Sequence, residues 1–132
     1  MSSLTDDTRW LDATAQAELV ASGKVTPLEM VNAAIERVER YDGALNALTY
    51  RWFEAARELA SSNTLPDGPF RGVPYLLKDL YAAEAGKPLS NGSKAYKAAD
   101  YVSSEDTTLV SRYKAAGLIS IGRSNSPEFG SV

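Results

Sequence analysis

The stretch that decides the fold is Val73-Pro74-Tyr75-Leu76-Leu77, a short apolar run between Gly72 and the polar pair Lys78-Asp79. Its length and composition are typical of a buried β-strand, and proline is tolerated among the first residues of a strand. A second apolar run, Leu118–Ile121, ends where Gly122-Arg123 begins. The second half of the chain is therefore predicted to contain two buried strands.

A helix is predicted between these two strands, from about Thr107 to Ala116, with Ser104 or Asp106 as its N-cap. The segment from Tyr81 to Tyr101 before it is predicted to be a long loop. A strand, a helical crossover and a second strand in this order normally form a right-handed parallel unit. The fold class is therefore α/β, and the carboxyl ends of both strands are expected on one rim of the sheet, with Lys78 and the segment Arg123–Asn125.

The first half of the chain has a helical pattern after a polar tail at residues 1–9, which we expect to be flexible. Asp12 is a suitable N-cap for a helix that Gly23 ends. Thr26-Pro27-Leu28-Glu29 is a capping box with proline at the first helical position, so a helix is predicted from Pro27 to about Tyr41. Asp42-Gly43 is expected to end that helix.

A brief extended piece is expected over residues 44–50, and a further helix over 52–60. The loop composition of residues 61–72 then separates the two halves. The chain is thus predicted to be one domain-sized unit over 1–132, with a helical layer at 10–62 and an α/β part at 73–132.

The composition excludes several classes of site. The chain has 132 residues, a net charge of −3, no histidine and no cysteine. It therefore cannot supply a Ser-His-Asp triad, a zinc–thiolate site or a disulfide. No phosphate-binding glycine loop or metal cluster is recognisable, so we expect no cofactor. A weakly acidic chain without basic clusters or a long apolar segment indicates no nucleic acid, no membrane and a cytoplasmic location.

Lys78 is the candidate catalytic residue. It follows an apolar strand directly, and burial of its amine would favour the neutral form, which can accept a proton from a serine hydroxyl. The alternative is a structural lysine that reaches water beside Asp79, and position alone favours that alternative. Ser124 and Ser126 lie in Ser124-Asn125-Ser126-Pro127, where turn-forming and capping roles are the simpler interpretation.

Four segments in order resemble the amidase signature family. They are Gly72–Asp79, Asn91-Gly92-Ser93, Asp106–Gly117 and Ile121-Gly122-Arg123-Ser124-Asn125-Ser126-Pro127-Glu128-Phe129-Gly130. The helical first half is also similar, so the resemblance covers nearly the whole chain. Arg123 stands where the family usually has lysine, which we interpret as a conservative change away from the chemistry.

The resemblance implies hydrolysis of amide bonds by a Ser–Ser–Lys triad, with Lys78 as the triad lysine and a small-molecule amide as substrate. It also implies that both triad serines lie downstream of Val132, because in the family they follow the stretch that Pro127-Glu128-Phe129-Gly130 resembles. Neither Ser124 nor Ser126 matches either of them. The chain is then an incomplete piece of the family's α/β/α sandwich and is expected to be inactive alone.

Two alternatives stay open: a non-catalytic remnant that binds a partner, and part of a glutamyl-tRNA amidotransferase A subunit-like glutaminase. Two assemblies also stay open, a homo-oligomer and a complex with the missing C-terminal part.

Overall fold

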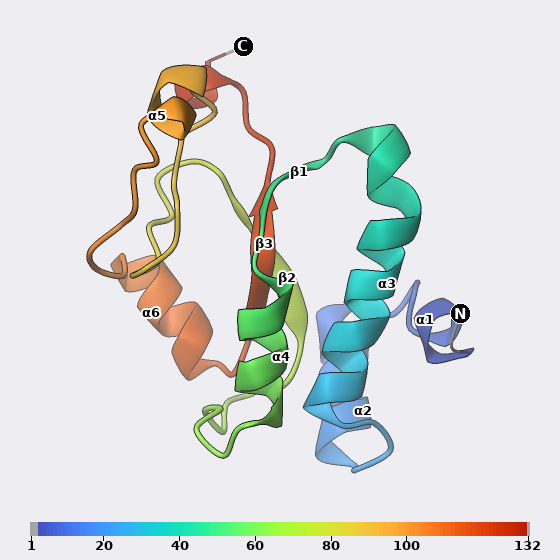
Figure 1. Cartoon of the computed structure of the whole chain (residues 1–132). Helices are drawn as coiled ribbons and strands as arrows, with labels where there is room; N and C mark the ends of the chain where they lie inside the picture. The colour runs from blue at the N-terminus through green and yellow to red at the C-terminus, as the bar shows by residue number, and fades with distance from the viewer. Residues whose placement is uncertain (1–2, 132) are drawn as a thin grey trace.

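The computed structural model describes residues 3–131 of the chain. Figure 1 shows a small central sheet, with α3 on one side, α6 on the other and α4 in front of the strands. In chain order the elements are α1 (Ser3–Asp7), α2 (Ala13–Ala21), α3 (Pro27–Leu45), β1 (Leu48–Arg51), α4 (Phe53–Ser61), β2 (Pro74–Lys78), α5 (Lys94–Ala98), α6 (Thr108–Ala115), β3 (Ile119–Ser124) and the 3-10 turn η1 (Glu128–Gly130).

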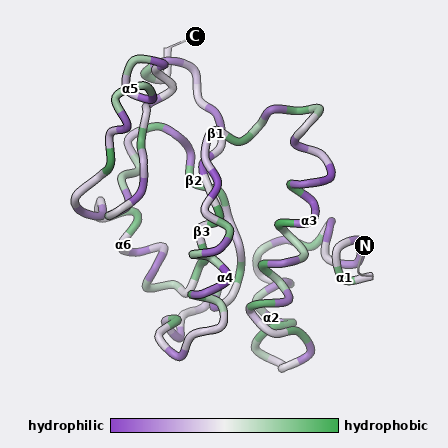
Figure 2. The backbone as a smooth tube through the Cα atoms, viewed as in Figure 1, coloured by the Kyte–Doolittle hydropathy of each residue, from purple (hydrophilic) through white to green (hydrophobic). Residues whose placement is uncertain are grey.

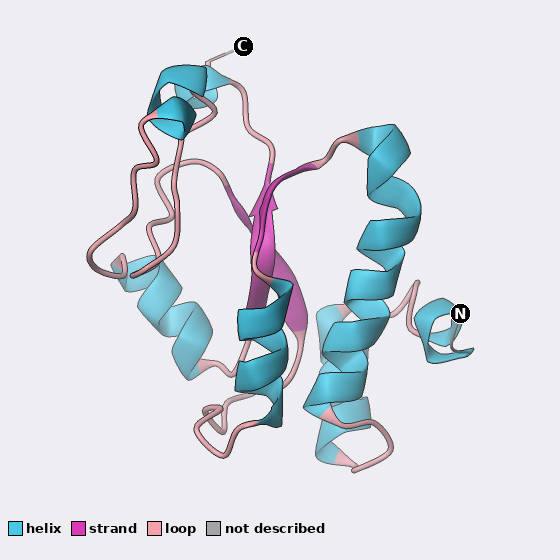
Figure 3. Cartoon of the chain, in the orientation of Figure 1, coloured by secondary structure: helices cyan, strands magenta, loops and turns pink. Residues whose placement is uncertain are grey.

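The sheet has the strand order β1-β3-β2. Strands β2 and β3 are parallel, with Pro74 opposite Ile119 and Lys78 opposite Ser124, which confirms the predicted parallel unit. Strand β1 pairs with β3 in the antiparallel direction, so the extended piece predicted near residues 44–50 is a full member of the sheet. The result is a small mixed sheet within an incomplete α/β fold (Figure 3).

Strand β3 is longer than predicted, because it continues past Ile121 to Ser124. Gly122 makes this possible: a Cβ atom added there would overlap the carbonyl oxygen of Tyr50 on β1. Both pairings of β3 also shift register beside this glycine, between Leu48 and Tyr50 on β1 and between Tyr75 and Leu76 on β2. Arg123 consequently lies inside the strand and is fully buried, rather than on the rim where the sequence predicts it.

Helices α2 and α3 begin as predicted. The Asp12 carboxylate accepts the backbone N–H of Ala15 at 2.8 Å. Thr26 and Glu29 form the complete capping box, in which Thr26 Oγ1 accepts the N–H of Glu29 and the Glu29 carboxylate accepts the N–H of Thr26. Local capping signals therefore determine both helix starts.

The predicted end of α3 at Asp42-Gly43 is wrong, because the helix runs on to Leu45 and ends at Asn46, which has a left-handed φ of 50°. The buried Asp42 carboxylate accepts the N–H groups of Ala47 and Leu48 and pairs with Arg51. A helical glycine costs about 1 kcal/mol, and hydrogen bonds to a charged group contribute about 1.5–3 kcal/mol each, so the interactions of Asp42 outweigh Gly43.

The expected flexible tail is also wrong for residues 3–9, while Met1 and Ser2 lie outside the described residues. Residues 3–7 form α1, and Thr5 and Thr8 are buried to 1% exposure. Arg37 on α3 donates to the Thr5 carbonyl oxygen at 2.9 Å and to Thr8 Oγ1 at 2.8 Å. Polar anchoring to α3, which hydropathy does not reveal, holds this segment.

Two apolar clusters lie on opposite faces of the sheet. Along α3, hydrophobic and hydrophilic residues alternate, as expected of a helix with one buried face (Figure 2). The first cluster joins α3 and α4 to β3 and contains Val31, Ile35, Ala56, Ala60, Leu65, Ile119 and Ile121. The second joins β2 to α6 and contains Leu77, Ala82 and Val110, with Trp52, Tyr75 and Tyr113 packed against it.

Helix α6 is predicted correctly within one residue at each end, but its cap is not. Thr107, rather than Ser104 or Asp106, is the N-cap and accepts the N–H of Val110. Asp106 instead accepts the N–H of Ala85 and pairs with Lys114 on α6. Among residues 3–131, no helix combines the length and the hydropathy needed to cross a bilayer.

Candidate functional site

The carboxyl ends of β2 and β3 form the predicted rim. Lys78 and Ser124 are paired across the two strands, and the N–H of Asp79 donates to the carbonyl oxygen of Ser124 at 2.9 Å. Asn125, the next residue, donates its N–H to the carbonyl oxygen of Ala47. Lys78, Ser124 and Asn125 therefore lie on one rim, as the topology predicts.

The side chain of Lys78 is exposed, in contrast to the expectation that its amine lies against apolar surface. Within the described chain its amine forms no hydrogen bond or ion pair. Leu76, on the same face of β2, packs against the core under α3 and α4, but this cover does not reach the end of the strand. The strand alternation thus buries Leu77 on the α6 side and leaves Lys78 facing solvent.

The Asp79 carboxylate turns inward and does not pair with Lys78. Asp79 is fully buried, and its two oxygens accept the N–H and the hydroxyl of Ser90 and the N–H of Gly92. Lys78 thus reaches water, as the structural alternative predicts, but within the described chain its amine does not pair with Asp79. Asp79 therefore holds the Ser90–Gly92 segment against the end of β2, and its sequence signal is an acidic residue directly after a buried strand.

The turn at Asn91-Gly92 packs against the segment after β3. Asn91 Oδ1 accepts the N–H of Tyr81 at 2.9 Å, and the Asn91 carbonyl oxygen accepts the N–H of Phe129 at 2.8 Å. Gly92 has a φ of 70°, and a Cβ atom there would meet the backbone of Ser126 and Pro127. The structure thus brings two of the segments that carry the family resemblance into contact.

The two serines of this region differ from each other. Ser126 donates its hydroxyl to the carbonyl oxygen of Pro127 at 3.0 Å, which confirms its predicted role in capping a backbone group. Ser124 is the last residue of β3 and residues 125–127 form no turn, so the predicted turn over residues 124–127 is wrong. The carbonyl oxygen of Ser124 accepts the N–H of Asp79 and so holds the end of β2 in place.

Arg123 binds the backbone of the segment that begins at the rim. Its guanidinium donates to three carbonyl oxygens, those of Lys78 at 3.1 Å, Ala82 at 2.8 Å and Pro88 at 2.6 Å. Burial lowers the pKa of Arg123, while the charges of Asp79 and Glu84 raise it. Although the sequence predicts that Arg123 lies away from the chemistry, this residue holds the backbone of the candidate catalytic lysine.

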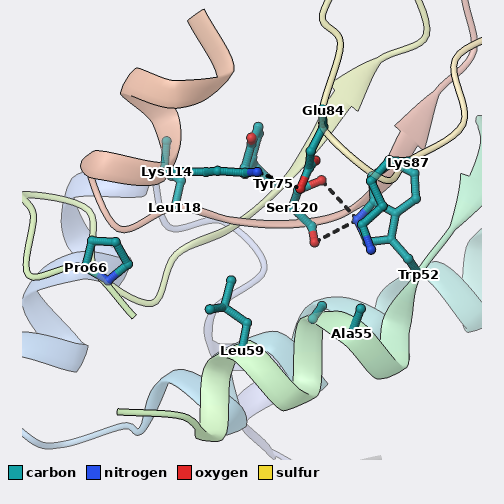
Figure 4. A pocket seen from close by; sticks show the side chains of 11 residues that line it. Trp52, Ala55, Leu59, Pro66, Tyr75, Glu84, Lys87, Lys114, Leu118 and Ser120 are labelled. Atoms are coloured by element: carbon teal, nitrogen blue, oxygen red, sulfur yellow. Dashed lines mark hydrogen bonds and ion pairs between the residues drawn. The ribbon is translucent and has the colours of Figure 1, made fainter. Parts of the chain in front are cut away.

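A pocket with a volume of about 280 Å³ opens between α4 and α6 on the β2–β3 face that carries Tyr75 and Ser120 (Figure 4). The Trp52 indole N–H forms part of its wall by donating to the carbonyl oxygen and the hydroxyl of Ser120, at 3.0 and 3.1 Å. Glu84, Lys87 and Lys114 supply its charged groups. No sequence pattern indicates this pocket, because its residues come from five separate segments.

Among residues 3–131, no group of three or more histidine, cysteine, aspartate or glutamate side chains is placed to hold a metal ion.

The model of the Amidase family matches residues 29–132. The chain belongs to the amidase family. It is 41% identical over 121 residues to the 6-aminohexanoate-cyclic-dimer hydrolase of Paenarthrobacter ureafaciens, a match that covers 92% of this chain and 24% of that relative. It is 34% identical to the glutamyl-tRNA(Gln) amidotransferase A subunit of Salinispora tropica, over 96% of this chain and 26% of the relative.

Solved structures agree with this assignment. The structure of 6-aminohexanoate cyclic dimer hydrolase superposes on this amidase chain with a TM-score of 0.85 at 39% identity, over 98% of this chain and 25% of that one. A bacterial aryl acylamidase of the amidase signature family superposes with a TM-score of 0.83 at 32% identity, over 93% and 26% of the two chains. The chain thus spans about a quarter of the length of the relatives it matches.

Proposed function

We propose that this chain forms the N-terminal quarter of an amide hydrolase that acts on small-molecule amides, and that Lys78 is its general base. The observation that carries the proposal is the place of Lys78 at the carboxyl end of β2, paired with Ser124 and held through its own carbonyl oxygen by Arg123. Sites in parallel sheets form beyond the carboxyl ends of the strands.

In the proposed mechanism the neutral Lys78 amine accepts a proton from a bridging serine, which in turn deprotonates a nucleophilic serine. The nucleophile attacks the amide carbonyl, and the proton passes back to the leaving amine. Lys78 is exposed in this chain. Cover by the rest of an amidase domain would remove water from the amine and favour its neutral form.

The 132-residue chain is proposed to be inactive alone. Ser124 ends a strand and Ser126 is engaged with Pro127, so neither serves as the bridging or the nucleophilic serine. A base without a nucleophile has nothing to activate, and loss of triad partners leaves at most binding and oxyanion effects. Association with a C-terminal part is the proposed route to activity.

A chimera tests this function. Residues 1–132 replace the matching quarter of the 6-aminohexanoate-cyclic-dimer hydrolase, and hydrolysis of simple aryl amides is measured. We expect turnover by the chimera, and a loss of about 10²–10⁴-fold or more in its Lys78→Ala variant. Lys78→Arg should fail as well, because a guanidinium stays protonated at neutral pH.

The matched control is Lys24→Ala, which removes another exposed lysine, in the turn between α2 and α3. Near-normal hydrolysis by either Lys78 variant would indicate that Lys78 is a structural residue and not the general base. The similarity to the amidotransferase A subunit supports a second candidate, a glutaminase, and glutamine in the same assay separates the two. A chimera that hydrolyses neither substrate favours a non-catalytic remnant.

A further inference from the structure

The pocket between α4 and α6 combines apolar and charged lining residues. Trp52, Leu59 and Leu118 supply apolar surface, which suits an aromatic ring or a branched aliphatic group. Figure 4 shows Glu84 between Tyr75 and Lys87, with Trp52 beside Lys87 and Leu59 of α4 across the pocket. Its volume of about 280 Å³ fits a small molecule rather than a peptide.

Glu84 supplies an unused hydrogen-bond acceptor inside this pocket. The residue is only 7% exposed, and its Oε1 lies 3.7 Å from Lys114 Nζ. Its Oε2 is buried and has no hydrogen-bond partner among residues 3–131. Buried carboxylate oxygens are normally satisfied, so an N–H or O–H group of a ligand would complete this one.

Lys87 supplies unused donors beside that acceptor. Its Nζ lies 5.3 Å from the centroid of the Trp52 ring and, in the described chain, forms no ion pair. Lys114, in contrast, is occupied by Asp106 at 2.9 Å. Tyr75 keeps its proton, because burial and the charge of Glu84 both raise the pKa of its hydroxyl. Among residues 3–131, the free groups beside Glu84 are therefore one acceptor, Glu84 Oε2, and two donor groups, the Lys87 amine and the Tyr75 hydroxyl.

We propose that this pocket binds a small uncharged carboxamide with an aromatic or branched aliphatic body. The amide N–H donates to Glu84, and the amide carbonyl oxygen accepts from Lys87, while the body contacts Trp52 and Leu59. A carboxylate ligand would place a second anion beside the unpartnered oxygen of Glu84. An amine ligand would place a cation beside Lys87 and Lys114. Lys78 does not line the pocket, so the proposal is independent of its catalytic role.

Three probes of nearly equal shape test the proposal: benzamide, benzoate and benzylamine. The chain has two tryptophans, and Trp10 is 83% exposed, so a Trp10→Phe background leaves Trp52 as the only tryptophan and as a reporter within the pocket. We expect benzamide to change the Trp52 fluorescence saturably with a Kd on the order of 1 mM, as small fragments of this size bind. Benzoate and benzylamine should bind at least about tenfold more weakly.

Two variants assign the contacts. Glu84→Gln keeps the size of the side chain but removes its charge, and should weaken benzamide binding about tenfold while reducing the discrimination against benzoate. Lys87→Met should weaken benzamide to a similar extent and improve benzylamine binding. Their matched controls are Glu105→Gln and Lys24→Met at exposed positions, which should change neither affinity nor preference.

Thermal unfolding first establishes that each variant is folded. If Glu84→Gln is unfolded, the result for Lys87→Met decides the test. Within the part of the chain that the structure describes, the Lys87 amine forms no buried hydrogen bond, so its removal leaves the fold intact. Equal affinity for the three probes would overturn the proposal. An unchanged preference in the folded variants would do so too, as would the lack of saturable benzamide binding up to about 50 mM.

Discussion

The Asp79 carboxylate accepts two hydrogen bonds from Ser90, one from its backbone N–H at 2.8 Å and one from its hydroxyl. Ser90 lies eleven residues further along the chain, and both residues are almost completely buried. The hydrogen bonds between Asp79 and Ser90 thereby hold the start of the long crossover, the segment between β2 and β3, against the end of β2 beside Lys78.

Replacement of Asp79 should destabilise the fold more than replacement of its partner. We expect Asp79→Asn to cost about 2–4 kcal/mol of unfolding free energy, because the buried carboxylate accepts three hydrogen bonds and faces the charge of Arg123. Ser90→Ala should cost about 1–2 kcal/mol. Urea unfolding measures both, with Asp100→Asn on the surface as control. Equal effects of Asp79→Asn and Asp100→Asn would contradict the anchoring role.

Lys78 should be dispensable for folding. Its side chain is exposed, so Lys78→Ala should change the unfolding free energy of the 132-residue chain by less than about 0.5 kcal/mol. Together with the activity loss expected in the chimera, this result would separate a chemical role from a structural one. A destabilisation comparable to that of Asp79→Asn would indicate a structural lysine.

Two glycines should respond to alanine in opposite directions. Gly122→Ala should destabilise the sheet by about 2–3 kcal/mol, because its Cβ would overlap the Tyr50 carbonyl oxygen and push β1 away from β3. Gly43→Ala should stabilise α3 by up to about 1 kcal/mol, because that helical position has open space around it. Thermal and urea unfolding of both variants check the signs, and a tolerated Gly122→Ala would refute the crowding.

Asp106 should make part of the stability depend on pH. Burial tends to raise its pKa, but hydrogen bonds from Lys114 and from the N–H of Ala85, with the charge of Lys114, bring the pKa below its usual 3.8. A lowered folded-state pKa adds stability that is complete above the unfolded value and is lost as the pH falls below it. Asp106→Asn should therefore cost about 0.5–1 kcal/mol at neutral pH and almost nothing near about pH 2.

Unfolding of the wild type and of Asp106→Asn at several pH values between about 2 and 7 measures this difference. Asp67→Asn, which replaces an exposed aspartate, is the matched control. A gap between wild type and Asp106→Asn that is constant across this range would show that ionisation of Asp106 does not contribute.

The isolated chain should self-associate. Strand β2 is an edge of the sheet, and the aromatic residues Tyr81, Tyr96 and Phe129 are exposed near its carboxyl end. Open edges and apolar patches favour pairing between chains, so we expect light scattering to report oligomers and calorimetry a broad thermal transition. Tyr96→Ser with Phe129→Ser should shift the population towards monomer, whereas Trp10→Ser at the other end of the molecule should not. A monodisperse monomer with a sharp transition would refute an incomplete core.

Sequence reasoning succeeds where a local pattern and its physical cause lie in the same segment. The capping residues Asp12 and Thr26 determine two helix starts, and the order of strand, helix and strand places Lys78 beside Ser124. It fails where a partner is distant in the sequence. The continuation of α3 depends on what the Asp42 carboxylate binds beyond the helix, and the burial of α1 depends on Arg37.

The candidate site follows the same division. Lys78 is identified from its position after a strand and from the family resemblance. Its exposure could not be predicted, because burial at the end of a strand depends on which helices cover that end. Arg123 is predicted to be a rim residue because Gly122 resembles a strand end. Only the pairing of β3 on both sides shows why a glycine continues this strand.

The three carbonyl oxygens bound by Arg123 divide the β2–β3 crossover into a part of fixed length and a part free to vary. An inserted residue between Lys78 and Pro88 would draw at least one carbonyl oxygen away from the guanidinium. Residues 94–100 are all exposed and hold no carbonyl that Arg123 binds, so insertions there leave the rim unchanged. Amidases with longer crossovers that keep this arginine are therefore expected to carry their additional residues after Ser93, where the chain can lengthen without displacing the lysine.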